Sequence, residues 1–314
     1  MPVPDARRIL VIKHSALGDF LLALGAFKAI RAHHPDAHIT LLTTAPYADF
    51  GRACGWFDAV EVDPKPSLWQ WGAWLGLRRF ITQSGFERVY DLQHSDRTHT
   101  YFRFFGRAKP EWSGIAKGCS HPHRNPARNA MHTLERQAEQ LADAGIPETP
   151  PPDLSWLDGD LAGLDLPDRF ALIVPGGAPH RPEKRWPATQ YGALATALCA
   201  TGIVPVAIGT NAEAAEIATI CQIEPRTQSL LGKTSFGQIV ALARRAALAV
   251  GNDTGPMHLI AAADCPAVVL FSRASVPAQT QPRGAAVTVI QRDGLADLGS
   301  EAVSEAATAI ARTP

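Results

Sequence analysis

The sequence predicts an α/β protein made of two doubly wound domains, each built on a parallel sheet. Three observations support this prediction. Short apolar runs alternate with helical patterns over most of the 314 residues, a Pro-rich acidic segment interrupts the alternation near the middle, and a Gly-containing polar turn follows an apolar run in each half. Strands that alternate with helices form βαβ units and parallel sheets, and this length suits two domains of ordinary size.

The first half starts with a buried strand and its turn. Residues 8–13 are almost continuously apolar, which is typical of a strand buried on both faces. The turn that follows contains Gly18 and leads into a helix. The other expected strands are 38–43, 59–62 and 88–92, and the expected helices are 20–32, 46–54, 68–82 and 131–144.

A change in composition marks the domain boundary. Residues 146–168 are rich in proline and acidic residues, as linkers often are. We therefore expect an N-terminal domain at 1–150, a linker at 151–168 and a second domain at 169–298. The expected elements after the linker are strands at 170–174, 204–208, 246–250, 267–271 and 287–290 and helices at 189–200, 212–221, 236–245, 257–263 and 300–312.

Composition and charge exclude several classes of protein. The formal net charge is zero, which argues against a general nucleic-acid binder. The five cysteines are scattered without a Cys-x-x-Cys pair, so neither a disulfide framework nor a zinc site is expected. Neither a signal peptide nor an apolar run long enough for a membrane span is evident. We expect a cytoplasmic protein that uses no metal and no cofactor.

Residues 250–263 are the strongest candidate for a functional site. An apolar strand leads into the tight turn Gly251–Gly255, and a helix follows. A helix N-terminus after such a turn offers backbone N–H groups and a positive dipole end to a phosphate. Asp253, Thr254 and His258 lie beside this position. The alternative is an ordinary helix capped by Asp253 or Thr254, with His258 in the core.

A second candidate turn lies in the first half, at residues 13–19. Gly18 permits close approach of the backbone to a ligand, and Asp19 stands at the start of a helix. The helix dipole stabilises a carboxylate there, so a general base at this position requires burial to offset the dipole. The alternative role of Asp19 is favourable charge at a helix N-terminus.

A third candidate is the loop at residues 174–187. It contains Gly176 and Gly177 together with several basic side chains. A loop of this kind can wrap an anion whose charge a Lys or Arg neutralises, and a solvated basic loop is the alternative. The basic side chains are His180, Arg181, Lys184 and Arg185.

The segment 94–136 differs in composition from the units around it. Eight lysines and arginines stand against three carboxylates, with five histidines and several aromatic residues interspersed. We expect loops here that bind an anionic, sugar-like partner, with a merely solvated face as the alternative.

The chain carries, in this order, the motifs Lys13-His-Ser-Ala-Leu-Gly-Asp19, Glu183-Lys-Arg-Trp-Pro187 and Asp253-Thr-Gly-Pro-Met-His-Leu-Ile-Ala-Ala-Ala263. Together they resemble the bacterial lipopolysaccharide heptosyltransferases, glycosyltransferase family nine. The resemblance implies a GT-B architecture: two Rossmann-like domains that face each other across a cleft, with residues 299–314 packing back on the first. It also implies a metal-independent, inverting transfer from a nucleotide-sugar donor on the second domain to an acceptor on the first.

The resemblance implies roles for individual residues. Asp19 matches the family's general base, which activates the acceptor hydroxyl, and Lys184 matches the lysine that contacts the donor diphosphate. The expected donor-binding residues are Gly176, Gly177, Lys184, Glu213 at the ribose, Thr234 and Ser235 beside the nucleobase, Asp253, Thr254, Gly255 and His258. The expected acceptor-binding residues are Ser15, Gly18, Arg97, Arg103, Arg124 and Arg128.

The implied activity is transfer of a heptose, or a related sugar, from a nucleotide-sugar donor such as ADP-heptose to an anionic, lipid-linked core saccharide. The implied location is peripheral, at the cytoplasmic face of the inner membrane, and no nucleic acid is expected as a partner. One departure concerns the donor: residues 272–277 read Ser-Arg-Ala-Ser-Val-Pro where the family usually has Gly-x-Thr. Arg273 could add a phosphate contact there, or the donor could differ.

The alternatives are a nucleotide-sugar epimerase of the same architecture and a non-catalytic sugar-nucleotide-binding protein. A redox enzyme is disfavoured because the dinucleotide fingerprint is missing.

Overall fold

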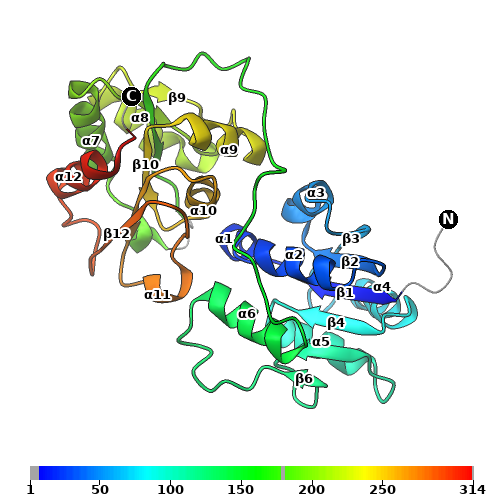
Figure 1. The fold of residues 1–314 in the computed structure, drawn as a ribbon. Helices are drawn as coiled ribbons and strands as arrows, with labels where there is room; N and C mark the ends of the chain where they lie inside the picture. The colour runs from blue at the N-terminus through cyan, green and yellow to red at the C-terminus, as the bar shows by residue number, and fades with distance from the viewer. Residues whose placement is uncertain (1–6, 178–180, 313–314) are drawn as a thin grey trace. The chain divides into compact units, whose positions relative to one another are not determined.

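The computed structural model describes residues 7–177 and 181–312, which form two compact units, one up to Trp156 and one from Leu157 onward (Figure 1). Each unit contains a six-stranded sheet whose strand pairs are all parallel. Helices connect most of the strands, as parallel neighbours require. In the described part of the chain, no helix is both long and apolar enough to cross a membrane.

The sheet of the first unit has the strand order β3-β2-β1-β4-β5-β6. The order reverses between β1 and β4, and ligands of doubly wound folds bind at such a reversal, beyond the carboxyl ends of the strands. The strands are β1 Arg8–Ile12, β2 His38–Thr43, β3 Ala59–Val62, β4 Arg88–Asp91, β5 Glu111–Gly114 and β6 His121–Pro122. The helices are α1 Leu17–Leu21, α2 Leu24–His33, α3 Ala45–Ala53, α4 Trp71–Gln83, α5 Asp96–Phe104 and α6 Thr133–Asp143.

The sheet of the second unit has the order β12-β11-β10-β7-β8-β9, and its reversal lies between β7 and β10. Its strands are β7 Phe170–Val174, β8 Val204–Ala207, β9 Gln228–Ser229, β10 Leu248–Asn252, β11 Ala267–Phe271 and β12 Val287–Gln291. Its helices are η1 Pro182–Lys184, α7 Ala188–Ala200, η2 Asn211–Glu213, α8 Ala214–Ile223, α9 Phe236–Arg245, α10 Gly255–Ala262, α11 Pro277–Thr280 and α12 Ser300–Ile310.

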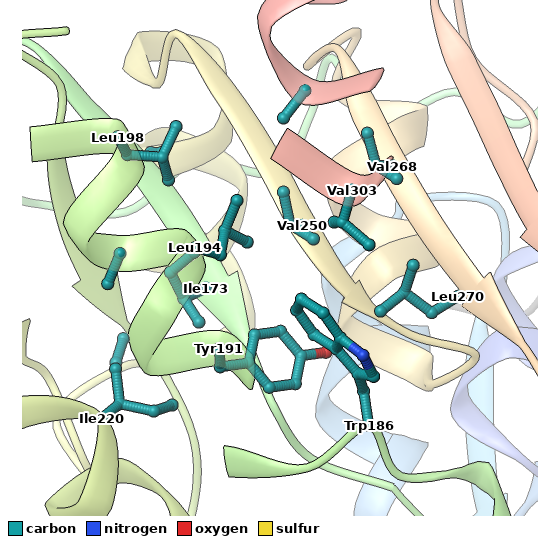
Figure 2. Close-up of a cluster of buried hydrophobic side chains, with 14 of the residues drawn as sticks. Ile173, Trp186, Tyr191, Leu194, Leu198, Ile220, Val250, Val268, Leu270 and Val303 are labelled. Atoms are coloured by element: carbon teal, nitrogen blue, oxygen red, sulfur yellow. The ribbon is translucent and has the colours of Figure 1, made fainter. Parts of the chain in front are cut away.

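The core of the second unit includes the C-terminal helix. Figure 2 shows Val303 of α12 beside Val250 and Val268 of the sheet, with Trp186 and Tyr191 in the same cluster. Because Val303 is fully buried there and α12 packs against α7, β10 and β11, this helix belongs to the second unit. The expectation that residues 299–314 also pack back on the first domain stays a prediction.

The segment 94–136 contains more regular structure than expected. It forms α5, β5 and β6 rather than loops alone. Trp112 on β5 is completely buried and packs edge-to-face on Phe102 of α5 at a centroid distance of 5.1 Å. The aromatic residues of this segment thus serve the core of the first unit as well as its surface.

Two expected element boundaries also need correction. The helix expected at 20–32 is two helices, α1 and α2, separated by Leu22 and Ala23. The strand expected at 246–250 is β10, which runs two residues further, so Gly251 lies in a strand and not in the turn.

The segment that connects the two units has neither helix nor strand between Ala144 and Arg169. Its beginning is bound to the first unit: Lys28 Nζ lies 2.6 Å from Asp153 Oδ2, and the Trp156 ring packs on Phe50. Its end is bound to the second unit, where Arg244 donates a hydrogen bond to the Leu157 carbonyl (2.9 Å).

Gly251 is required by close packing at the end of β10. A Cβ on Gly251 would lie 2.6 Å from Met257 Sδ and 2.7 Å from Val174 Cβ, which is fixed in β7. We therefore expect Gly251→Ala to lower the free energy of unfolding by about 1–3 kcal/mol, measured as the urea midpoint by circular dichroism. Gly76→Ala is the control, because its Cβ would meet open space in the middle of α4; it should raise stability slightly. Equal midpoints for both variants would contradict this account.

Candidate functional site

The second unit places two of the predicted loops side by side. The strands β7 and β10 are paired neighbours, with Val174 opposite Gly251, and each ends directly before one of the loops. The loop after β7 contains Gly176 and Gly177, and the turn after β10 contains Asp253 and Thr254. Both therefore lie at the reversal of strand order, where an open α/β sheet binds its ligand.

Asn252 holds these two loops together. Its side chain is fully buried, and its Nδ2 donates to the carbonyls of Pro175 (2.8 Å) and Gly176 (3.0 Å). Its Oδ1 accepts from the backbone N–H of Trp186 (3.0 Å) and from the Tyr191 hydroxyl (3.0 Å). The amide thus connects three segments that are distant in sequence. Sequence reasoning missed this residue, although a polar side chain at the end of an apolar strand was a signal.

Lys184 and Asp253 form an ion pair at this position. Lys184 Nζ lies 2.7 Å from Asp253 Oδ2, and the two side chains are only 13% and 10% exposed. Ser275 donates a second hydrogen bond to the same oxygen (2.6 Å). The structure therefore brings two predicted donor residues together and adds Ser275, which was missed. Its signal was the departure from the family pattern at residues 272–277.

The helix α10 begins beside this ion pair. Thr254 is its N-cap residue in extended conformation, and the Thr254 side chain makes no capping hydrogen bond. Gly255 is the first helical residue, and His258 is buried on the next turn. Because the Thr254 side chain leaves the first N–H groups uncapped, the positive end of this helix can bind an anion.

Arg185 and Glu213 line the other side of the Gly176–Gly177 loop. Arg185 donates to the Gly177 carbonyl (2.7 Å) and pairs with Glu216 (2.7 Å). Glu213 is buried, and its Oε2 accepts from the backbone N–H (2.9 Å) and hydroxyl (2.8 Å) of Thr210. A Cβ on Gly176 would come within 3.2 Å of Glu213 Cγ, so glycine lets the loop pack directly on this carboxylate.

Two of the predicted donor residues have no such connection. Ser235 is the N-cap of α9, where its hydroxyl accepts from the Gln238 N–H (3.2 Å), and the part-buried Thr234 precedes it. Within the described residues, neither forms a hydrogen bond or ion pair with Lys184, Glu213 or Asp253. His180 lies outside the described residues.

The first unit has its own polar cluster at the reversal between β1 and β4. Lys13, directly after β1, is 4% exposed and donates to the Leu92 carbonyl (3.2 Å). Burial lowers the pKa of Lys13, and the nearby Asp19 carboxylate opposes this shift. Asp91, the last residue of β4, is fully buried, and burial raises its pKa although the N–H groups of Gln93 and His94 donate to it.

Asp19 belongs to this cluster. It is the third residue of α1, is half-buried, and accepts a hydrogen bond from the Ala16 N–H (3.3 Å). The preceding turn is held by Gln93, whose Oε1 accepts from the N–H of Ser15 (3.3 Å). Burial lowers the pKa of Arg136 on α6, and the charge of Asp19 acts against this shift, so the two groups interact. Sequence reasoning counted Arg136 among the basic residues but gave it no role.

The four predicted acceptor arginines do not share one environment. Arg97 is part-buried; it donates to the Pro66 carbonyl (3.2 Å) and lies over the Trp74 ring at 5.0 Å. Arg128 approaches His94 Nδ1 (3.2 Å) at the cluster that contains Lys13. Arg103 and Arg124 are exposed. Only Arg97 and Arg128 are thus fixed by contacts near the end of the sheet.

A buried acid–base group lies on the same edge of the first unit. His14 Nε2 lies 3.0 Å from Asp63 Oδ2, and Tyr101 donates a hydrogen bond to the same carboxylate. Burial alone raises the pKa of Asp63, but the hydrogen bonds from His14 and Tyr101 and the N–H of Lys65 outweigh it and lower the pKa. Asp63 is therefore a buried anion that depends on its donors.

No three His, Cys, Asp or Glu side chains gather as metal ligands anywhere in residues 7–177 and 181–312. The polar groups described at the two reversals, histidines and hydroxyls among them, lie at distances from one another that suit hydrogen bonding and charge pairing.

Comparison with known proteins identifies relatives that match most of the chain. The family model described as glycosyltransferase family 9 (heptosyltransferase) matches residues 119–301. Lipopolysaccharide heptosyltransferase 2 of Escherichia coli K12 is 28% identical over 90% of this chain and 88% of its own length. Lipopolysaccharide heptosyltransferase 3 of the same strain is 32% identical over 81% of this chain and 79% of its own length.

The fold agrees with this relationship. The solved structure of E. coli ADP-heptose lipopolysaccharide heptosyltransferase II covers 96% of this chain and 98% of its own, with a TM-score of 0.75 and 23% identity. The predicted GT-B fold class, with two parallel-sheet domains, is confirmed.

The buried amide of Asn252 gives a sharp test of the second unit. In Asn252→Asp a carboxylate replaces the donor to Pro175 and Gly176 and lies against their carbonyl oxygens. We expect the free energy of unfolding to fall by at least about 2 kcal/mol, measured by urea denaturation. Asn129→Asp, at an exposed position, is the control and should change it little. An unchanged midpoint for Asn252→Asp would refute the bridging role.

The lowered pKa of Asp63 predicts a pH dependence. A folded pKa below the unfolded value means that the ionised carboxylate stabilises the fold above about pH 3.9 and that this contribution is lost as pH falls through the folded pKa. Asp63→Asn should therefore lower the free energy of unfolding at neutral pH, and its difference from wild type should shrink below about pH 4. Asp49→Asn, at a fully exposed carboxylate, should show almost no difference at either pH. A constant Asp63→Asn difference across this range would contradict the assignment.

Proposed function

Because the chain belongs to glycosyltransferase family 9, the heptosyltransferases, we propose that it transfers a heptose from ADP-heptose to the core saccharide of lipopolysaccharide. The names of its relatives support both partners: two carry lipopolysaccharide in their names, and the solved relative is named for ADP-heptose. The proposed reaction inverts the anomeric carbon and needs no metal.

The observation that carries this proposal is the Lys184–Asp253 ion pair at the start of α10. A diphosphate bound at the reversal between β7 and β10 would meet the ammonium group and the helix N-terminus together. Cleavage of the bond between the sugar and the diphosphate leaves negative charge on the departing phosphate oxygen. A fixed ammonium group and helix dipole stabilise that charge, as a metal ion does in other enzymes.

Lys184 already has a partner before the donor arrives. The carboxylate of Asp253 neutralises it, and Ser275 shares that carboxylate. In the proposed cycle Lys184 turns part of its hydrogen bonding from Asp253 to the diphosphate, while Ser275 continues to hold Asp253. Glu213 and the Gly176–Gly177 loop complete the proposed donor site on the ribose side.

Asp19 is the proposed general base of the first unit. The acceptor hydroxyl oxygen attacks the anomeric carbon from the side opposite the diphosphate, and its proton passes to the Asp19 carboxylate. The electron pair of the broken sugar–phosphate bond leaves with ADP. The half-buried position of Asp19 beside Lys13 and Arg136 supports this role, because these cations would hold its carboxylate in place.

The proposed place of action is the cytoplasmic face of the inner membrane. The acceptor is anchored in lipid, so the enzyme must reach a membrane surface. All five cysteines are free thiols, as is usual for a reducing compartment.

Calorimetric titration with ADP, UDP, GDP and CMP, with and without magnesium, tests the donor. We expect selective, magnesium-independent binding of ADP, weakened in Lys184→Ala and intact in Asp19→Ala. With ADP-heptose and delipidated core saccharide, Asp19→Ala should lower kcat by about 10²–10⁴-fold, the usual contribution of a general base. Arg245→Ala and Asp49→Asn, both at exposed positions, are matched controls. Equal loss of ADP affinity in both active-site variants would contradict the division of roles, and preference for UDP or GDP would replace the proposed donor.

A further inference from the structure

The exposed apolar side chains of the described residues are concentrated in one short stretch of the first unit. Of seven large hydrophobic residues that are exposed, five lie between residues 62 and 75. They are Val62 (41% exposed), Leu68 (77%), Trp69 (84%), Trp71 (72%) and Leu75 (53%). Such a concentration is unusual on a protein surface and indicates an interaction site. We call residues 62–79 the tryptophan patch.

Helix α4 has a buried face in addition to the exposed face that carries part of this patch. On α4, Leu77 and Ile81 are buried in the first unit's core. Trp71, Leu75 and the pair Arg78–Arg79 are all exposed. Their spacing of four, seven and eight residues puts them on one face. The helix therefore has a second, outward face that is apolar in its first turns and basic further along.

Trp74, in the same stretch, differs from Trp69 and Trp71 because contacts within the first unit hold its ring in place. Trp74 Nε1 donates to the Ser67 carbonyl (3.0 Å), and the Arg97 guanidinium lies over its ring. Trp69 and Trp71 lie within five residues of it and remain largely exposed to solvent. Of the three tryptophans at 69–74, Trp74 is held by these contacts and the other two remain exposed to solvent.

Most of the charge around the patch is positive: its carboxylates are Asp63, which is buried and held by His14 and Tyr101, and the exposed Glu61 at its edge. Between Asp63 and Glu87 the sequence holds Lys65 and the pair Arg78–Arg79 and no carboxylate. The neighbouring stretch 97–109, most of which forms α5, adds four cations and again no carboxylate. Helices α4 and α5 contact each other in the first unit. An anionic partner is therefore complementary to the patch and its surroundings.

The apolar surface continues into a hollow beside α4. The hollow has a volume of about 320 Å³ and is lined mainly by apolar residues. Val62 of the patch lines it together with Leu42, Pro64, Ala73, Gly76, Leu77 and Phe80, and Glu61 is its one charged lining residue among the described residues.

The patch is also connected to the candidate acceptor side of the first unit. Lys65 Nζ lies 3.5 Å from the Ser15 hydroxyl, four residues before Asp19. Arg97, a predicted acceptor residue, donates to the Pro66 carbonyl. A surface bound to the patch would therefore lie next to the turn that carries Asp19.

We propose that the tryptophan patch docks on an anionic lipid bilayer. Trp69, Trp71, Leu68 and Leu75 enter the interface between headgroups and acyl chains, and the flanking lysine and arginines bind lipid phosphates. Exposed tryptophans beside leucines and an excess of cations are typical of membrane-interface anchors. The choice of lipid over a protein surface rests on the proposed function, because its acceptor is lipid-linked.

The test is co-sedimentation of the full chain with vesicles of phosphatidylcholine alone or with phosphatidylglycerol added. Wild type should bind the anionic vesicles, and high salt should weaken this binding. Trp69→Ala/Trp71→Ala should lower the partition coefficient by roughly tenfold or more, and Arg78→Ala/Arg79→Ala should remove most of the salt dependence. Trp69→Phe/Trp71→Phe should retain much of the binding. Arg245→Ala/Arg292→Ala, which removes two exposed cations of the second unit, should behave as wild type.

Activity measurements separate this proposal from the proposed function. Trp69→Ala/Trp71→Ala should transfer sugar normally to delipidated core saccharide and poorly to acceptor embedded in vesicles. Transfer to both acceptors without any vesicle binding by wild type would overturn the docking proposal alone. Vesicle binding without transfer from any nucleotide sugar would overturn the proposed function alone. A wild-type dimer that Trp69→Ala/Trp71→Ala dissociates would assign the patch to self-association and overturn the docking proposal.

Discussion

The second unit depends on the hydrogen bonding of one buried amide. Asn252 has no access to water, so all four of its hydrogen-bonding positions have to be met by protein groups, and they are. A carboxylate could not donate and a hydrophobic side chain could do neither, which makes asparagine the side chain suited to this position. The loop after β7, the start of α7 and the end of β10 are held in one arrangement as a result. The Lys184–Asp253 pair forms within that frame.

The first unit solves a similar problem with charged groups. Lys13 directly follows β1, Asp91 ends the adjacent β4, and both are buried. Burial lowers the pKa of Lys13 and raises that of Asp91, so that in each case the neutral form is favoured. Each is partly compensated, Lys13 by a carbonyl and the Asp19 charge, and Asp91 by backbone N–H groups. Such compensation holds Asp19 in a polar environment whose charges are fixed in place. A carboxylate that must take up and release a proton works best where its surroundings do not have to rearrange.

Sequence reasoning reached the parts of this structure that depend on local pattern. The continuously apolar runs located β1, β2, β7 and β11 to within a residue, because strands buried on both faces have a distinctive composition. Helix α5 was not predicted because its sequence is polar, and its structure depends on the packing of Tyr101 and Phe102. The break between α1 and α2 falls at Leu22 and Ala23, where no proline or glycine marks the end of a helix. The bridging by Asn252 and the bond from Ser275 to Asp253 join residues far apart in sequence, and no spacing rule predicts them. The roles of Asp19, Glu213, Thr234 and the acceptor arginines stay predictions.

The distribution of charge has a consequence for how the molecule approaches a surface. The whole chain has a formal net charge of zero, yet the stretches 64–86 and 97–109 hold seven cations and no carboxylate, so the remainder carries seven more carboxylates than cations. Far from an anionic surface, a molecule with zero net charge experiences almost no net electrostatic attraction to it. Close to the surface, the positive stretches are attracted and the acidic remainder is repelled. The molecule therefore rotates until the positive stretches face the anionic surface. Encounters would then be selected by orientation before any side chain touches the surface, and raising the ionic strength would randomise that orientation first.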